Sequence, residues 1–178
     1  MSPDPKNPAP KTPAPKTHDH QADFYSDAYL VDILKEVRTI ALVGASDKPH
    51  RASNGVFGFL QQQGYEMFPV NPALAAGGVR SGSGAEAGQK IWGRPCFASL
   101  ADLKAQGHAI DMVDVFRASD AALEMTKEAI AIGVKVIWMQ LEVVSYEAAE
   151  LAEAAGIRVV MNRCPAIEIP RLAGLGLL

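Results

Sequence analysis

Small and basic residues directly follow the first apolar run of the sequence, residues 39–43. They are Gly44, Ala45, Ser46 and Lys48. Ser53 then opens a helical pattern that ends at Gly64, and residues 66–70 form a second apolar run. In a strand–turn–helix–strand unit of this kind, the start of the helix directs free backbone N–H groups at a phosphate. The spacing therefore predicts a phosphate-binding turn after the first strand.

The rest of the chain predicts the elements that must position this turn. Apolar runs at 95–97, 110–116, 134–139 and 157–161 alternate with helical patterns. This alternation predicts a single-domain α/β fold, Rossmann-like and doubly wound, with a mostly parallel sheet and helices on both faces. The expected strand order is 3-2-1-4-5-6, which opens a crevice beyond strands one and four. Residues just past the strand ends would share that rim: Asn71, Pro72, Arg117, Gln140, Asn162, Arg163 and Cys164.

Local signals set the expected helix ends. An amphipathic helix is predicted over 25–37, with Ser26 or Asp27 as its cap. Serines are also expected to cap the later helices, and glycines to end them. The expected caps are Ser99, Ser119 and Ser145, and the expected helix ends are Gly133 and Gly156.

Two segments differ in composition from the domain, which is expected to span 23–178. Residues 1–22 repeat Pro-Ala-Pro-Lys-Thr and predict a disordered, partly polyproline II tail, in which His18 and His20 are solvated. Residues 73–90 are rich in glycine, alanine and serine and predict an exposed loop insertion, either a tolerated surface loop or a lid.

The composition narrows the classes of partner and the cellular location that we expect for this protein. The net charge of −3 gives no reason to expect nucleic-acid binding, and the sequence lacks an apolar run long enough for a membrane span. Two cysteines make no disulfide framework, and the N-terminus lacks the apolar segment of a secretion signal, so the expected location is cytoplasmic.

The expected ligand carries several phosphates. Four basic residues fall on or near the predicted rim: Lys48, Arg51, Arg117 and Arg163. The G-x-G-x-x-G pattern of dinucleotide sites is absent, and Asn71 stands where such sites place the acid that holds a ribose. Each cation could also be a plain surface charge, and Arg117 could pair with Asp114 or Asp120.

Six short motifs in this order carry a resemblance across about residues 33–172. They are VGAS with KP and Ser53, PVNP, SLADL, VDVFR, WMQ and VMNRC. The chain resembles the stand-alone CoA-binding domain family, which is related to the CoA-binding domain of the succinyl-CoA synthetase α subunit. The resemblance implies that coenzyme A or an acyl-CoA is held by Gly44, Ala45, Ser46, Lys48, Ser53, Val70, Asn71, Pro72, Arg117, Met139, Gln140 and Leu141. The resemblance also implies that Ser53 caps its helix and offers its hydroxyl to the diphosphate.

No complete catalytic set is evident, because no histidine follows His108 and no nucleophile–base pair stands out. Glu142 is the one acid to test as a base. Cys164 beside Arg163 would have a lowered pKa and could form a mixed disulfide with the CoA thiol. The leading hypothesis is a non-catalytic carrier, sensor or regulator. The alternatives are an NAD(P)-binding oxidoreductase or accessory subunit, and a scaffold whose proline tail binds a protein partner.

Overall fold

Strands and helices alternate along the chain, as the apolar pattern predicts. The computed structural model describes residues 25–75 and 89–178. The main strands are β1 (Thr39–Val43), β2 (Glu66–Val70), β5 (Met112–Val115), β6 (Val136–Met139) and β7 (Arg158–Val160). The helices are α1 (Asp27–Glu36), α2 (Ala52–Gln62), α3 (Pro72–Ala75), α4 (Leu100–Ala105), α5 (Ser119–Ile132), α6 (Tyr146–Ala154) and α7 (Pro165–Gly174). A separate hairpin joins β3 (Lys90–Ile91) to β4 (Arg94–Pro95).

The five main strands form one parallel sheet in the order β2-β1-β5-β6-β7. The Rossmann-like α/β fold is thus confirmed, and these strands follow the predicted order. Val43 pairs with both Val70 and Val115, and Val115 pairs with Met139. The carboxyl ends of four neighbouring strands therefore lie level at one edge of the sheet.

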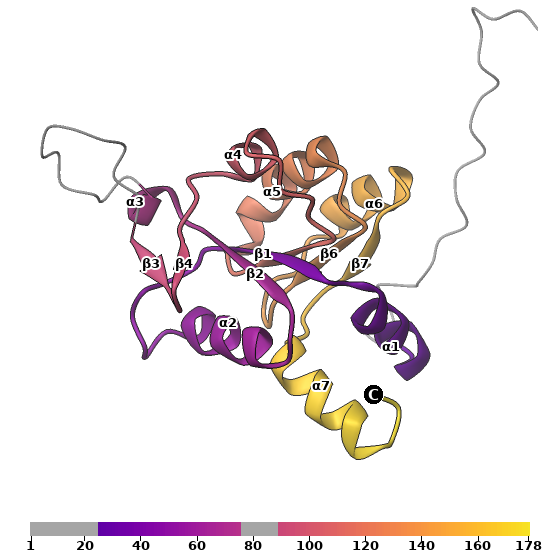
Figure 1. The fold of residues 1–178 in the computed structure, drawn as a ribbon. Coiled ribbons are helices and arrows are strands. Elements are labelled where there is room, and N and C mark those ends of the chain that lie inside the picture. Colours follow the sequence, from indigo (N-terminus) through magenta and orange to yellow (C-terminus); the bar gives the residue numbers. More distant parts are fainter. Residues whose placement is uncertain (1–24, 76–88) are drawn as a thin grey trace, which may run out of the picture.

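Alternate side chains of the sheet feed two separate cores, because neighbouring strand residues point to opposite faces. Ala41, Val113 and Ile137 pack on the face covered by α4, α5 and α6. Leu42 and Trp138 pack on the opposite face with α1, α2 and α7 (Figure 1). Both faces of the sheet are thereby removed from water.

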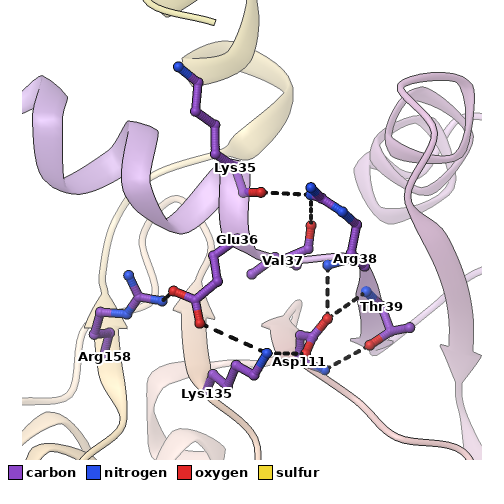
Figure 2. Close-up of polar contacts among 8 residues, drawn as sticks. All are labelled: Lys35, Glu36, Val37, Arg38, Thr39, Asp111, Lys135 and Arg158. Carbon is purple, nitrogen blue, oxygen red and sulfur yellow. Dashed lines mark hydrogen bonds and ion pairs between the residues drawn. The ribbon is translucent and has the colours of Figure 1, made fainter.

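An ionic network ties the opposite, amino-terminal edge of the sheet together (Figure 2). The Asp111 carboxylate accepts hydrogen bonds from the backbone N–H groups of Arg38 and Thr39 at 2.9 and 3.2 Å, and its other oxygen lies 2.9 Å from Lys135 Nζ. Burial raises the pKa of Asp111, but the hydrogen bonds from Lys135 and from these two amides outweigh it and hold the pKa below its usual value. This end of the sheet is fixed and lies away from the crevice.

The predicted edge strand over 95–97 is wrong. Pro95 pairs antiparallel with Lys90 in the hairpin, and only Phe97 reaches the main sheet, as a single bridge to Val70. Proline lacks the N–H that a longer pairing would need. Phe97 still occupies the predicted place beside β2, where its N–H donates to the Pro69 carbonyl at 2.9 Å.

The start of helix α5 also differs from expectation, whereas three other helix starts agree with it. Ser26, Ser99 and Ser145 cap their helices as predicted, each accepting a backbone N–H. Ser119 does not cap α5, since the N-cap is Ala118 and the Ser119 hydroxyl instead accepts from the Val144 N–H at 3.0 Å.

Helix α7 was not predicted. It begins at Pro165, a favoured first helical residue, and buries Ile169 and Leu172 against the α1–α2 side of the sheet. None of the helices in residues 25–75 and 89–178 has both the length and the apolar character needed to cross a membrane.

The two compositionally distinct segments lie mostly outside the described residues. The predicted tail over residues 1–22 falls entirely outside the described residues. The predicted insertion over 73–90 lies there except at its two ends, which form the last part of α3 and the start of β3.

Candidate functional site

The turn after β1 depends on a glycine. Gly44 has φ +87°, a value that side chains disfavour, and a Cβ added there would lie 2.3 Å from the Phe116 carbonyl oxygen. The missing side chain lets the ends of β1 and β5 approach. The N–H groups of Gly44 and Ala45 both donate to the Val70 carbonyl, at 3.0 and 3.3 Å. These two amides hold the turn against β2 and are not available to a ligand.

Helix α2 begins at Ala52, two residues before the start that a Ser53 cap would give. Its N-cap is Arg51, with no side-chain capping bond, so the prediction that Ser53 caps the helix is wrong. Ser53 lies in the first turn and is buried. The first N–H groups of a helix have no partner within it, so those of Ala52 and Ser53 are free of helical hydrogen bonds.

Three adjoining cavities follow the carboxyl edge of the sheet. The small cavity, of about 170 Å³, is lined by Val43, Gly44, Val70, Asn71, Pro72, Ala98, Ser99, Leu100, Arg117, Ala121, Met125 and Glu128. The middle cavity, of about 550 Å³, is lined by Gly44, Ala45, Ser46, Asp47, Lys48, Arg51, Ala52, Ser53, Asn71, Leu74, Phe116 and Arg117. The large cavity, of about 800 Å³, is lined by Ala52, Val56, Phe116, Arg117, Ala118, Ser119, Gln140, Leu141, Glu142, Val143 and Cys164.

Arg117 lines all three cavities, so they adjoin one another along the carboxyl edge of the sheet and together are termed the cleft. The middle cavity also holds Lys48 and Arg51, and Asp47 is the one acid among the described residues that line it. It is therefore positive although the chain as a whole is negative. The structure joins Arg117 to no other described residue by an ion pair, and Asp114, one of its expected partners, is bonded to Gln140.

Most of the residues singled out from the sequence line this cleft, and Met139, Asn162 and Arg163 do not. Met139 is fully buried in the core beneath the cleft. Arg163 lies outside the cavity linings and pairs with Glu168, at 3.7 Å, at the start of α7. Asn162 turns its side-chain oxygen to the Glu142 N–H at 2.9 Å, so it shapes the backbone of the rim.

A buried polar pair underlies the large cavity. Asp114 is fully buried, and its Oδ1 accepts from Gln140 Nε2 at 2.8 Å, while Oδ2 has no partner in the described residues. Burial raises the pKa of Asp114 to about 7 against the opposing effect of the Gln140 hydrogen bond. Gln140 is buried as well, and it presents the edge of this pair to the large cavity.

Cys164 lies at the wall of the large cavity, but its chemistry differs from expectation. Burial is the main influence and raises the pKa of the thiol, with backbone N–H groups of α7 opposing it. Arg163 does not lower it, because that guanidinium is directed to Glu168. At neutral pH the thiol is therefore protonated and a poor nucleophile.

Sequence comparison places these features in a family. The fold defines the chain as a Rossmann-like α/β protein. The family described as "CoA binding domain" matches residues 38–170, which include the turn, the sheet and all three cavity linings. The chain belongs to this CoA-binding domain family.

Three relatives illustrate the similarity. "Uncharacterized protein YneT" of Bacillus subtilis (strain 168) is 32% identical over 140 residues, which cover 78% of this chain and 90% of that protein. A hypothetical protein from Pyrococcus horikoshii OT3 is 35% identical with a TM-score of 0.73, covering 85% of this chain and 95% of that one. A Thermus thermophilus structure is 32% identical with a TM-score of 0.71, covering 83% and 99%.

Proposed function

We propose that this chain binds coenzyme A or an acyl-CoA in the cleft and acts as a cytoplasmic carrier, sensor or regulator without catalysing a reaction itself. Membership of the CoA-binding domain family supports the ligand. The proposal of a non-catalytic role rests on the chemistry of the described cleft, where the cysteine is a buried, protonated thiol and the buried carboxyl of Asp114 faces an amide rather than a nucleophile.

The observation that carries this proposal is the position of Arg117 at the junction of all three cavities. The cleft has a positive centre between two flanking cavities with more apolar linings. Coenzyme A has the same order of groups, with a diphosphate between an adenosine and a long thiol-bearing arm. The middle and large cavities fall within the usual size of small-molecule sites, which is about 300–1,000 Å³.

Each residue then has a proposed role. Ser46, Lys48 and Arg117 contact the phosphates, with the N–H groups of Ala52 and Ser53 completing the phosphate site. Gly44 and Ala45 form the turn itself. Val70, Asn71 and Pro72 flank the adenosine, Gln140 and Leu141 lie along the arm, and Met139 supports that wall from the core.

A thermal-shift panel of CoA, acetyl-CoA, NAD and NADP tests the ligand class, because a ligand that binds only the native state raises the unfolding temperature. At a hundredfold excess over its dissociation constant, CoA should raise the midpoint by about 5–10 °C. NAD and NADP should leave it unchanged, since the G-x-G-x-x-G pattern of dinucleotide sites is absent, and Asn71 also replaces the acid that holds a ribose in NAD sites. A shift with NAD or NADP and none with CoA would favour the oxidoreductase alternative.

A further inference from the structure

Two side-chain amides fix the carbonyl groups of the turn after β1. Asn71 Nδ2 donates to the Ala45 carbonyl oxygen at 2.8 Å, and Asn54 Nδ2 donates to the Ser46 carbonyl oxygen at 2.8 Å. In a trans peptide the N–H points opposite to the C=O. Drawing both carbonyls toward the protein therefore turns the N–H groups of Ser46 and Asp47 outward, and both residues line the middle cavity.

Asn71 is itself held on three sides. Its Oδ1 accepts the Ala73 N–H at 2.9 Å, and its own N–H donates to the Phe97 carbonyl at 2.9 Å. An oxygen that accepts a backbone N–H must be the amide oxygen, so the other branch is the nitrogen that donates to Ala45. The Asn71 side chain is therefore fixed with its amide nitrogen on the turn.

Asn54 is held by a tryptophan from a distant part of the chain. Trp92 Nε1 donates to both the backbone oxygen and the Oδ1 of Asn54, at 3.1 and 3.2 Å. Asn54 is 9% exposed, so water cannot readily replace this donor. Fixing the Asn54 oxygen leaves its Nδ2 directed at the Ser46 carbonyl.

The backbone conformation at Trp92 places its indole ring beside Asn54. Trp92 has φ +49°, uncommon for a bulky residue, and with Gly93 it forms the turn of the β3–β4 hairpin. Its ring rests on Gly58 of α2, where an added Cβ would lie 2.4 Å from the indole. The positive φ of Trp92 and the close approach of its ring to Gly58 place the indole beside Asn54, and backbone strain of this kind concentrates at functional sites.

We infer that Asn54 and Asn71 are positioning residues that pre-arrange the phosphate turn, and that Trp92 holds Asn54 in place. The inference rests on the proposed function for its ligand. A turn that adopts its binding form only part of the time weakens apparent affinity by that fraction. The loss appears as slower association, because complexes that do form keep their contacts and dissociate at the original rate.

Stopped-flow kinetics with CoA on the full chain test this inference. Trp92→Phe removes the indole N–H together with part of the ring that packs on Gly58, and it should slow association about 3–10-fold. Asn54→Leu should slow association about 10–100-fold, and each variant should change dissociation less than about twofold. Gln61→Leu is the matched control, since it removes a different bond between α2 and the hairpin, from Gln61 Nε2 to the Trp92 carbonyl. Faster dissociation in Trp92→Phe, or association as fast as in Gln61→Leu, would overturn the inference.

Hydrogen exchange on the ligand-free chain separates this inference from the proposed function. The amides of Ala45 and Lys48, which are hydrogen-bonded in the turn, should exchange faster in Trp92→Phe and Asn54→Leu than in Gln61→Leu, at matched unfolding temperatures. Unchanged exchange there would refute the positioning role whatever the ligand. Failure of the unaltered chain to bind CoA would instead refute the proposed function, and the exchange data would still decide the role of Trp92.

Discussion

Replacing Asp114 with asparagine should change how stability depends on pH. The carboxyl is fully buried, one oxygen accepts from Gln140, and burial raises its pKa to about 7. In the unfolded chain an aspartate titrates near about 3.9. Between these two values the folded state holds a proton that the unfolded state has released, so the unaltered chain loses stability as pH rises. Asparagine has the same shape and does not titrate.

The size of the effect follows from the two pKa values. A separation of about three units corresponds to about 4 kcal/mol in all, of which about 3 kcal/mol falls between pH 4.5 and pH 7. The free energy of unfolding of Asp114→Asn, relative to the unaltered chain, should therefore rise by about 3 kcal/mol over this range. The neighbouring thiol of Cys164 does not disturb the comparison, because burial raises its pKa and it stays protonated.

Urea titrations at four pH values between 4.5 and 7 measure this difference. Asp111→Asn is the matched control, because the folded pKa of Asp111 is lowered and both its folded and unfolded forms are charged throughout the range. Its difference from the unaltered chain should stay flat. A difference for Asp114→Asn that is equally flat would show that the buried carboxyl does not hold a proton, and would refute the account of this pair.

Three other perturbations probe the turn and the cleft. Gly44→Ala places a Cβ 2.3 Å from the Phe116 carbonyl oxygen, so urea titrations should show that the free energy of unfolding falls by at least about 2 kcal/mol. Gly64→Ala, with φ +93° and open space around it, should lower the free energy of unfolding by only about 1 kcal/mol. Equal losses in the two variants would contradict the close approach at Gly44. Ser46→Trp should fill the middle cavity and abolish CoA binding in calorimetry, and unchanged affinity would count against this phosphate site. Incubation with oxidised CoA at pH 7 should give no CoA-sized mass increase, because the Cys164 thiol is protonated; an adduct that disappears in Cys164→Ser would contradict this.

Much of the fold is readable from local patterns. The runs 39–43 and 66–70 became strands with those bounds, because each is a short apolar stretch beside a glycine turn, with Gly44 after the first and Gly64 before the second. Ser26, Ser99 and Ser145 cap helices because each is followed directly by a helical pattern.

Tertiary context decided where local patterns failed. Ser53 and Ser119 resemble caps, yet their helices start one residue or more earlier, and Ser119 bonds to the neighbouring loop instead. Helix α7 carries Pro170 inside it, which reads as a break in a sequence. Its buried stripe, including Ile169 and Leu172, compensates by packing against the core.

For the cleft too, local patterns predict some features and tertiary contacts decide the others. Parallel strands bring their carboxyl ends together, so the sequence alone assigns the residues after five strands to one rim. It does not predict the role of Asn71, because an asparagine after a strand gives no sign that its amide holds a carbonyl 26 residues earlier. The bond from Trp92 to Asn54 spans 38 residues and depends on a hairpin, and no local pattern predicts it.

Isothermal titration calorimetry of CoA into the full chain tests the central claim most directly. We expect one CoA per chain, with affinity falling about 10–100-fold in Arg117→Gln, because that guanidinium lines all three cavities and would contact phosphate. Lys127→Gln removes the same charge from an exposed site outside the cleft and should bind as the unaltered chain does. The absence of CoA binding, or equal affinity in both variants, would contradict the account.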